Sequence, residues 1–161
     1  MKTAIIYASK HGTTEKVGGL IAEKLQTTDE VALFSLKKNS KIDINAFETV
    51  ILGAPVYAGR ISRKMKTFCK VNETVLLQKN IGLFVCGMEL SKEKQKKELN
   101  DAFSDVLLKQ SKTTGFLGGA FLFDKMNFFE RMIIKKIAKT TTSVQRIDNK
   151  AVNDFIIHLK T

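Results

Sequence analysis

The chain has no tryptophan, one proline, two tyrosines and two cysteines among its 161 residues. Cys69 and Cys86 do not form a Cys-x-x-Cys pair, which argues against a disulfide framework and a zinc site, so no bound metal is expected. The longest apolar run, Phe116 to Phe123, is too short to span a bilayer. Strand-like residues begin at Thr3 without a basic leader, so we expect a cytoplasmic protein with no signal peptide.

Acidic residues are also scarce: 16 Asp and Glu face 27 Lys and Arg, for a net charge of +11. Such a surplus attracts nucleic acid, anionic lipid or acidic proteins. The missing tryptophan, the few tyrosines and the lack of a binding motif argue against nucleic acid. With 43% hydrophobic residues and no linker or repeat, residues 1–161 are expected to form one domain.

Strand and helix patterns alternate along the chain, which predicts an α/β protein with a doubly wound parallel sheet. We expect five strands in the order 2-1-3-4-5, with the ligand beyond the carboxyl ends of the first and third. A helix over residues 91–109 should bury Leu99, Phe103, Val106 and Leu107. The predicted strands are 2–8, 30–36, 49–53, 81–86 and 115–122, and the other predicted helices are 13–26, one beginning after a Ser62 cap, and 148–159.

A polar loop, residues 9–14, joins the first strand directly to the first helix. A strand that enters a helix through Ser, Gly and Thr offers free N–H groups and hydroxyls at the positive end of the helix dipole. This arrangement suits a phosphate monoester, although Ser and Thr before a helix also serve as N-caps and Gly12 also eases a tight turn. The loop lacks the glycine pattern of dinucleotide folds and the Gly-Lys-Ser/Thr of nucleoside triphosphate sites.

Two further segments should meet this loop at the same sheet edge. Residues 54–59 follow the third strand and offer an aromatic surface, a rigid proline and a freely rotating glycine. Gly87-Met88 follows the fourth strand and lets the backbone approach a flat ring closely. A phosphate at one loop and a planar ring between two others describe flavin mononucleotide, FMN.

With these motifs the chain resembles the flavodoxin family over essentially its full length, which implies a flavodoxin-like fold and FMN as cofactor. The matching motifs are Ser9-x-x-Gly12-x-Thr14, residues 53–59 and Cys86-Gly87-Met88. The resemblance implies that the first loop holds the phosphate and the other two flank the flavin ring, with the Gly59 carbonyl as the candidate for the contact to flavin N5. The cofactor-binding residues expected on this basis are Ser9, Lys10, His11, Gly12, Thr13, Thr14, Pro55, Val56, Tyr57, Ala58, Gly59, Cys86, Gly87 and Met88.

An extra segment after the fifth strand, Asp124 to Lys139, looks like that of menaquinone-dependent protoporphyrinogen oxidases, which are flavodoxin-like enzymes. The likeness implies dehydrogenation of protoporphyrinogen IX to protoporphyrin IX, with electrons passing to a quinone. The segment reads as an amphipathic basic helix with Phe129 on its apolar side and Arg131 on its basic side, and Glu130 projects among the apolar residues.

Three roles for this helix remain open: packing on the core, resting on an anionic membrane where a quinone is met, or covering the flavin. In the last role Arg60, Arg63 and Arg131 would meet substrate carboxylates. His11 would donate to the phosphate or remain a solvated loop histidine, His158 would lie on the surface, and no side chain is assigned as a general base.

Three functions therefore remain. The first is an FMN-dependent protoporphyrinogen dehydrogenase with a quinone acceptor. The second is a flavodoxin electron carrier that docks to redox-partner proteins. The third is a flavin-free basic module that binds polyanions or membranes through its surface charge.

Overall fold

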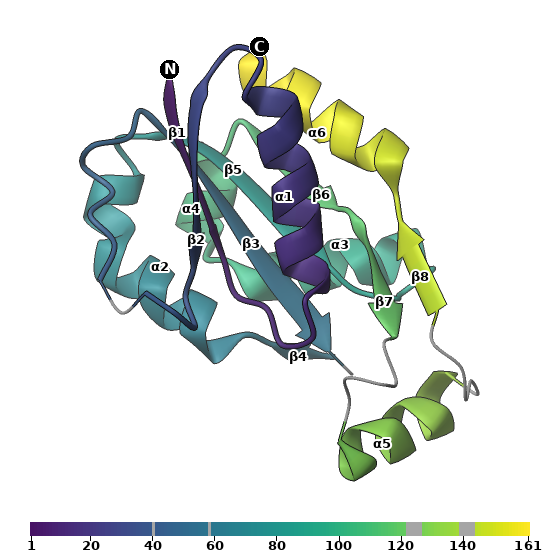
Figure 1. The fold of residues 1–161 in the computed structure, drawn as a ribbon. Helices are drawn as coiled ribbons and strands as arrows, with labels where there is room; N and C mark the ends of the chain where they lie inside the picture. The colour runs from purple at the N-terminus through teal and green to yellow at the C-terminus, as the bar shows by residue number, and fades with distance from the viewer. Residues whose placement is uncertain (40, 58, 122–126, 139–143) are drawn as a thin grey trace.

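The protein is described by a computed structural model that places residues 1–39, 41–57, 59–121, 127–138 and 144–161. Its centre is a parallel sheet in the order β2-β1-β3-β5-β6, with the short β4 paired to β3 (Figure 1). This is the predicted doubly wound order, because β5 and β6 are the fourth and fifth strands of the parallel sheet. The sheet consists of β1 (Lys2–Tyr7), β2 (Glu30–Ser35), β3 (Thr49–Tyr57), β4 (Arg60–Ile61), β5 (Asn80–Cys86) and β6 (Thr113–Phe116).

Helices cover both faces of the sheet, and each face has its own apolar core. One face packs Val17, Ile21 and Phe155 against Ile5 and Phe84, as expected when the central strands are apolar throughout. The other face buries side chains from three helices against the alternate residues of the same strands. The helices are α1 (Thr13–Leu25) and α6 (Asn149–Lys160) on the first face, and α2 (Arg63–Leu76), α3 (Lys92–Ala102) and α4 (Asp105–Gln110) on the second.

The predicted helix over 91–109 is wrong, because the chain breaks it after Ala102. Phe103 is extended (φ −128°, ψ 154°), and the Ser104 side chain accepts a hydrogen bond from the Leu107 N–H to cap α4. This break turns Val106 outward, so it is 49% exposed rather than buried, whereas Leu99, Phe103 and Leu107 are buried as expected.

The predicted strand 115–122 is also two separate strands. Gly118 has φ +83°, a conformation that side-chain-bearing residues rarely adopt, and it turns the chain out of the parallel sheet. The chain then forms an antiparallel hairpin from β7 (Gly118–Phe121) and β8 (Val144–Ile147), in which Phe121 pairs with Val144. Strand β8 was not predicted.

Helix α5 (Phe128–Ala138) lies between β7 and β8 in the sequence, apart from the two helical layers (Figure 1). The predicted extra helix is therefore present, and it extends from the end of a hairpin rather than from the parallel sheet. Within the described residues, no helix is long and apolar enough to cross a membrane.

Candidate functional site

The first loop brings an open helix start to the carboxyl edge of the sheet. Gly12 is the N-cap of α1, with φ +92°, and no side chain caps the helix. The Ser9 hydroxyl accepts from the Gly12 N–H at 3.0 Å, so it closes the loop and does not cap α1. The first N–H groups of α1 are consequently left for water or a ligand, at the positive end of the helix dipole.

Thr14 is the buried polar group of this loop. The residue is 1% exposed, and its Oγ1 has no hydrogen-bond partner among the described residues. The hydroxyl does interact with the nearby Cys86 thiol: burial raises the pKa of Cys86 to about 12, and the contact with Thr14 acts in the opposite direction. A buried hydroxyl with only a weakly polar neighbour costs free energy, and a ligand oxygen would satisfy it.

The three predicted segments meet at one small cavity of about 40 Å³. Gly12 and Gly59 do not line it, and Ala58 lies outside the described residues. Gly119 and Ala120 of β7 do line it and were not predicted. The other lining residues are Ser9, Lys10, His11, Thr13, Thr14, Pro55, Val56, Tyr57, Cys86, Gly87 and Met88.

The segment after the predicted third strand is not a simple loop. Strand β3 continues to Tyr57, where Tyr57 pairs with Arg60 of β4, and Pro55 lies in register with Cys86 of β5. Gly59 lies between β3 and β4 with φ +72° and is exposed, so its peptide can turn outward. The hairpin holds the Tyr57 ring 5.4 Å from the His11 ring, between their centroids.

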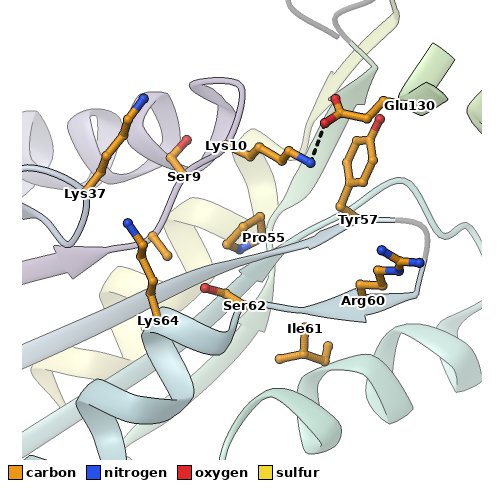
Figure 2. Close-up of a pocket in the computed structure, with 11 residues that line it drawn as sticks. Ser9, Lys10, Lys37, Pro55, Tyr57, Arg60, Ile61, Ser62, Lys64 and Glu130 are labelled. Carbon is orange, nitrogen blue, oxygen red and sulfur yellow. Dashed lines mark ion pairs between the residues drawn. The ribbon is translucent and has the colours of Figure 1, made fainter. Parts of the chain in front are cut away.

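Glu130 of α5 lies against the first loop, contrary to the prediction that it projects among apolar residues. Its side chain is 9% exposed and forms an ion pair with Lys10 (Figure 2). Its Oε2 also lies 2.8 Å from His11 Nε2. These two atoms are close but not aligned for a hydrogen bond. The expectation of a solvated His11 is also wrong, since its side chain is 12% exposed.

The cause of this placement is a local motif at the start of α5. Asn127 Oδ1 accepts from the Glu130 N–H at 2.9 Å, and Asn127 Nδ2 donates to Glu130 Oε1 at 3.2 Å. Burial alone would raise the pKa of Glu130, but Lys10, His11 and Asn127 together hold it below its ordinary value. The Asn-x-x-Glu spacing of a capping box was the sequence signal that could have located this carboxylate.

Tyr57 is held as a neutral phenol beside this carboxylate. Burial, followed by the negative charge of Glu130, raises the pKa of Tyr57 to about 12. The Lys10 ammonium lies 5.3 Å from the centroid of the Tyr57 ring. At neutral pH Tyr57 is therefore a hydrogen-bond donor and not a base.

The remaining candidates lie apart from this cavity. Arg63 lines a different hollow between α2 and the segment after β2, and Arg131 is exposed on α5. His158 is exposed and Cys69 is buried, as expected, whereas Cys86 is buried and lines the cavity. No group of His, Cys, Asp and Glu suited to a metal occurs within the residues that the structure describes.

An open helix start at the switch point of a doubly wound parallel sheet places the chain in the class of doubly wound α/β proteins, in which ligands bind at this edge of the sheet. The flavodoxin domain model matches residues 4–148, and the chain belongs to the flavodoxin family. Protoporphyrinogen IX dehydrogenase [quinone] of Leishmania major is 23% identical over 146 residues. A flavodoxin of Clostridium saccharobutylicum is 33% identical over 84 residues. These matches cover 87% and 51% of the chain, and 63% and 52% of the relatives' own lengths.

Solved structures agree with the fold. A short-chain flavodoxin associated with a bacterial microcompartment superimposes with a TM-score of 0.59 at 16% identity, covering 99% of this chain and 97% of that one. The Fusobacterium nucleatum flavodoxin bound to flavin mononucleotide gives 0.55 at 18% identity, covering 99% and 96%. The first part of the sequence prediction, a flavodoxin-like fold, is confirmed.

Proposed function

We propose that the chain binds FMN between its three clustered segments and uses it for electron transfer. The observation that carries this proposal is the buried Thr14 hydroxyl at an uncapped helix start, facing a cavity lined by both ring-flanking segments. An anion with several oxygens would accept from Thr14 and from the free N–H groups of α1. Lys10 would add positive charge and His11 a ring nitrogen for hydrogen bonding once they are released from Glu130.

The residues around the cavity support a proposal for the remaining cofactor contacts. Pro55 and Tyr57 would cover one side of the flavin ring, and Gly87-Met88 would approach the other. Gly59 is the candidate for the carbonyl that meets the ring, because its positive φ and exposed position leave the peptide free to turn. When bound, FMN supplies the redox chemistry, and the chain positions it and excludes water.

For the reaction, we propose a dehydrogenase of the protoporphyrinogen type with a quinone acceptor. The similarity to the Leishmania major protein supports this, and so does α5, whose Glu130 contacts Lys10 and His11 of the first loop. Exposed Phe128, Phe129 and Met132 beside Arg131 and Lys136 suit a helix that rests on an anionic membrane, where a quinone is reached. The chain would act as one domain in the cytoplasm, peripheral to the membrane.

A flavodoxin-type electron carrier is the second candidate, favoured by the 33% identity to the Clostridium protein.

The two candidates are distinguished by anaerobic turnover of protoporphyrinogen. The FMN-loaded chain is given a soluble menaquinone analogue as acceptor, and the porphyrin formed is measured by its fluorescence. The matched variant replaces residues 122–143 by Asn-Gly, a turn that suits a hairpin whose strands already pair at Phe121 and Val144.

If the full chain oxidises protoporphyrinogen and the variant binds FMN but does not, the dehydrogenase is supported. FMN uptake and electron exchange without porphyrin formation would favour the carrier. No FMN uptake by either protein would reject both, and the basic surface would then be the functional feature, as in a flavin-free polyanion-binding module.

A further inference from the structure

A second, larger cavity of about 400 Å³ opens beside the first. It lies between the ends of β1 and β2, the β3–β4 hairpin and the start of α2 (Figure 2), and its lining is partly apolar. The apolar part is formed by Ala8, Pro55, Tyr57 and Ile61. The rest of the lining is polar, and it consists of Ser9, Lys10, Lys37, Arg60, Ser62, Lys64 and Glu130.

The charges around this cavity are unbalanced. Lys10 is paired with Glu130, whereas Lys37, Arg60 and Lys64 form no ion pair with any described residue. Lys37 and Lys64 lie together at one end in Figure 2, and Arg60 lies at the other, beside Tyr57. These three cations, without an ion-pair partner among the described residues, make the surroundings of the cavity positive, which favours an anionic ligand.

The two cavities are also adjacent. Ser9, Lys10, Pro55 and Tyr57 line both of them, so molecules bound in the two cavities would lie close to each other, against the same few side chains. The smaller cavity holds the phosphate-type loop and the buried Thr14 hydroxyl, whereas the larger one holds the unpaired cations. The polar groups of the two cavities differ, and this difference indicates two different ligands.

We propose that the larger cavity is the substrate site and binds an apolar molecule that carries at least two carboxylates. This assignment rests on the proposed flavin-dependent function, because the substrate must lie beside the ring. Lys37 and Lys64 bind the carboxylates, Arg60 adds a bidentate partner at the opposite end, and Pro55, Ile61 and Tyr57 contact the apolar body. Of the three arginines considered from the sequence, only Arg60 belongs to this site.

The experiment measures binding of protoporphyrin IX, a flat dicarboxylate, to the full FMN-loaded chain by fluorescence anisotropy. The test variant is Lys37→Gln with Lys64→Gln. The matched control is Lys109→Gln with Lys112→Gln, which removes the same charge from exposed residues at the opposite edge of the sheet. Protoporphyrin dimethyl ester serves as the uncharged probe, and the FMN dissociation constant of every protein is measured separately.

We expect the test variant to bind the free acid about 10-fold more weakly, and the control variant to bind it like the wild type. The ester should bind all three proteins equally and weakly, and FMN affinity should be unchanged. Equal porphyrin binding by wild type and test variant, or no binding by the wild type, would overturn the substrate site while leaving flavin binding intact. A matching loss of FMN affinity in the test variant would overturn it by making this cavity the flavin site. Failure of the wild type to take up FMN would instead reject the proposed function.

Discussion

Glu130 and Glu98 are two partly or fully buried carboxylates whose environments shift their pKa values in opposite directions. Glu130 is held below its ordinary value by Lys10, His11 and Asn127, despite its burial. Burial, with the nearby charges of Glu89 and Asp101, raises the pKa of Glu98, and its Oε2 has no hydrogen-bond partner among the described residues. The two residues therefore offer matched tests of the local electrostatics.

Replacing each glutamate by glutamine should change stability with opposite sign. Because the folded state favours the Glu130 carboxylate, Glu130→Gln should lower the free energy of unfolding at pH 7 by roughly 1–2 kcal/mol. This difference should disappear as the pH falls through the lowered pKa of Glu130. Glu98→Gln should instead stabilise the protein at pH 7, and its gain should disappear as the pH falls through the raised pKa of Glu98. Urea unfolding between about pH 3 and pH 7 measures both, and effects of the same sign would contradict the assignment.

Substitution of Thr14 should change ligand affinity and protein stability in opposite directions. Thr14→Val removes a buried hydroxyl that lacks a good partner, so the free energy of unfolding of the apoprotein should rise by about 1 kcal/mol. The same change removes a phosphate donor, so FMN affinity should fall about 10-fold, while Thr14→Ser keeps it. Thermal unfolding and flavin fluorescence titration measure the two effects. A variant that loses stability and keeps affinity would show that Thr14 is a packing residue.

At the scale of elements, the β7–β8 hairpin forms part of the wall of the small cavity through Gly119 and Ala120. Its first strand passes so close to the segment after β5 that a Cβ on Gly119 would lie 2.4 Å from the Gly87 carbonyl oxygen. Gly119 also lines the small cavity. Its lack of a side chain therefore allows the hairpin and the Gly87-Met88 segment to form one wall.

Gly119→Ala should displace this wall, because the clash involves backbone atoms on both sides. We expect a loss of roughly 1–3 kcal/mol in unfolding free energy and at least about 10-fold weaker FMN binding. Gly19→Ala is the matched control, since a Cβ there meets nothing within 4 Å and alanine favours the helix by up to about 1 kcal/mol. Normal FMN binding by the Gly119→Ala protein would remove this contact from the site.

Helix α5 exposes Phe128 and Phe129, which are 71% and 73% accessible and whose rings contact each other. If the helix rests on a membrane, replacing both by serine should reduce cosedimentation with phosphatidylglycerol vesicles about 10-fold. Stability should not change, because neither side chain is buried. Val71→Ser, which changes a residue 76% exposed on α2, controls for surface hydrophobicity, and equal losses in both proteins would argue against α5 as the contact.

At the scale of the whole molecule, the alternating strand and helix patterns were sufficient to predict the parallel sheet and its order. They failed where one residue redirects the chain: Ser104 begins a new helix, and Gly118 turns the fifth strand outward. Periodicity reports which faces are apolar, and it does not register a single cap or a single positive φ. The first loop could be located for the same reason, since strand, loop and helix are adjacent in sequence.

Glu130 could not be placed by sequence periodicity. Its position depends on a hairpin, β7–β8, that was not predicted, and on contacts with Lys10 and His11, which are more than a hundred residues away. A helical wheel assigns it to a face of α5 and cannot tell what that face meets. The large cavity was missed for a similar reason, because Lys37, Arg60 and Lys64 come from separate elements.

The proposed phosphate site is tested most directly by comparing how tightly the purified, flavin-free chain binds FMN and riboflavin. Visible absorption and flavin fluorescence measure the binding of each ligand. The two ligands differ only by the phosphate that the Thr14 hydroxyl and the open start of α1 would bind. We predict uptake of one FMN per chain with about 100-fold weaker binding of riboflavin, a difference of roughly 2.7 kcal/mol. Equal binding of the two flavins, or no uptake of FMN, would contradict the phosphate site on which the account depends.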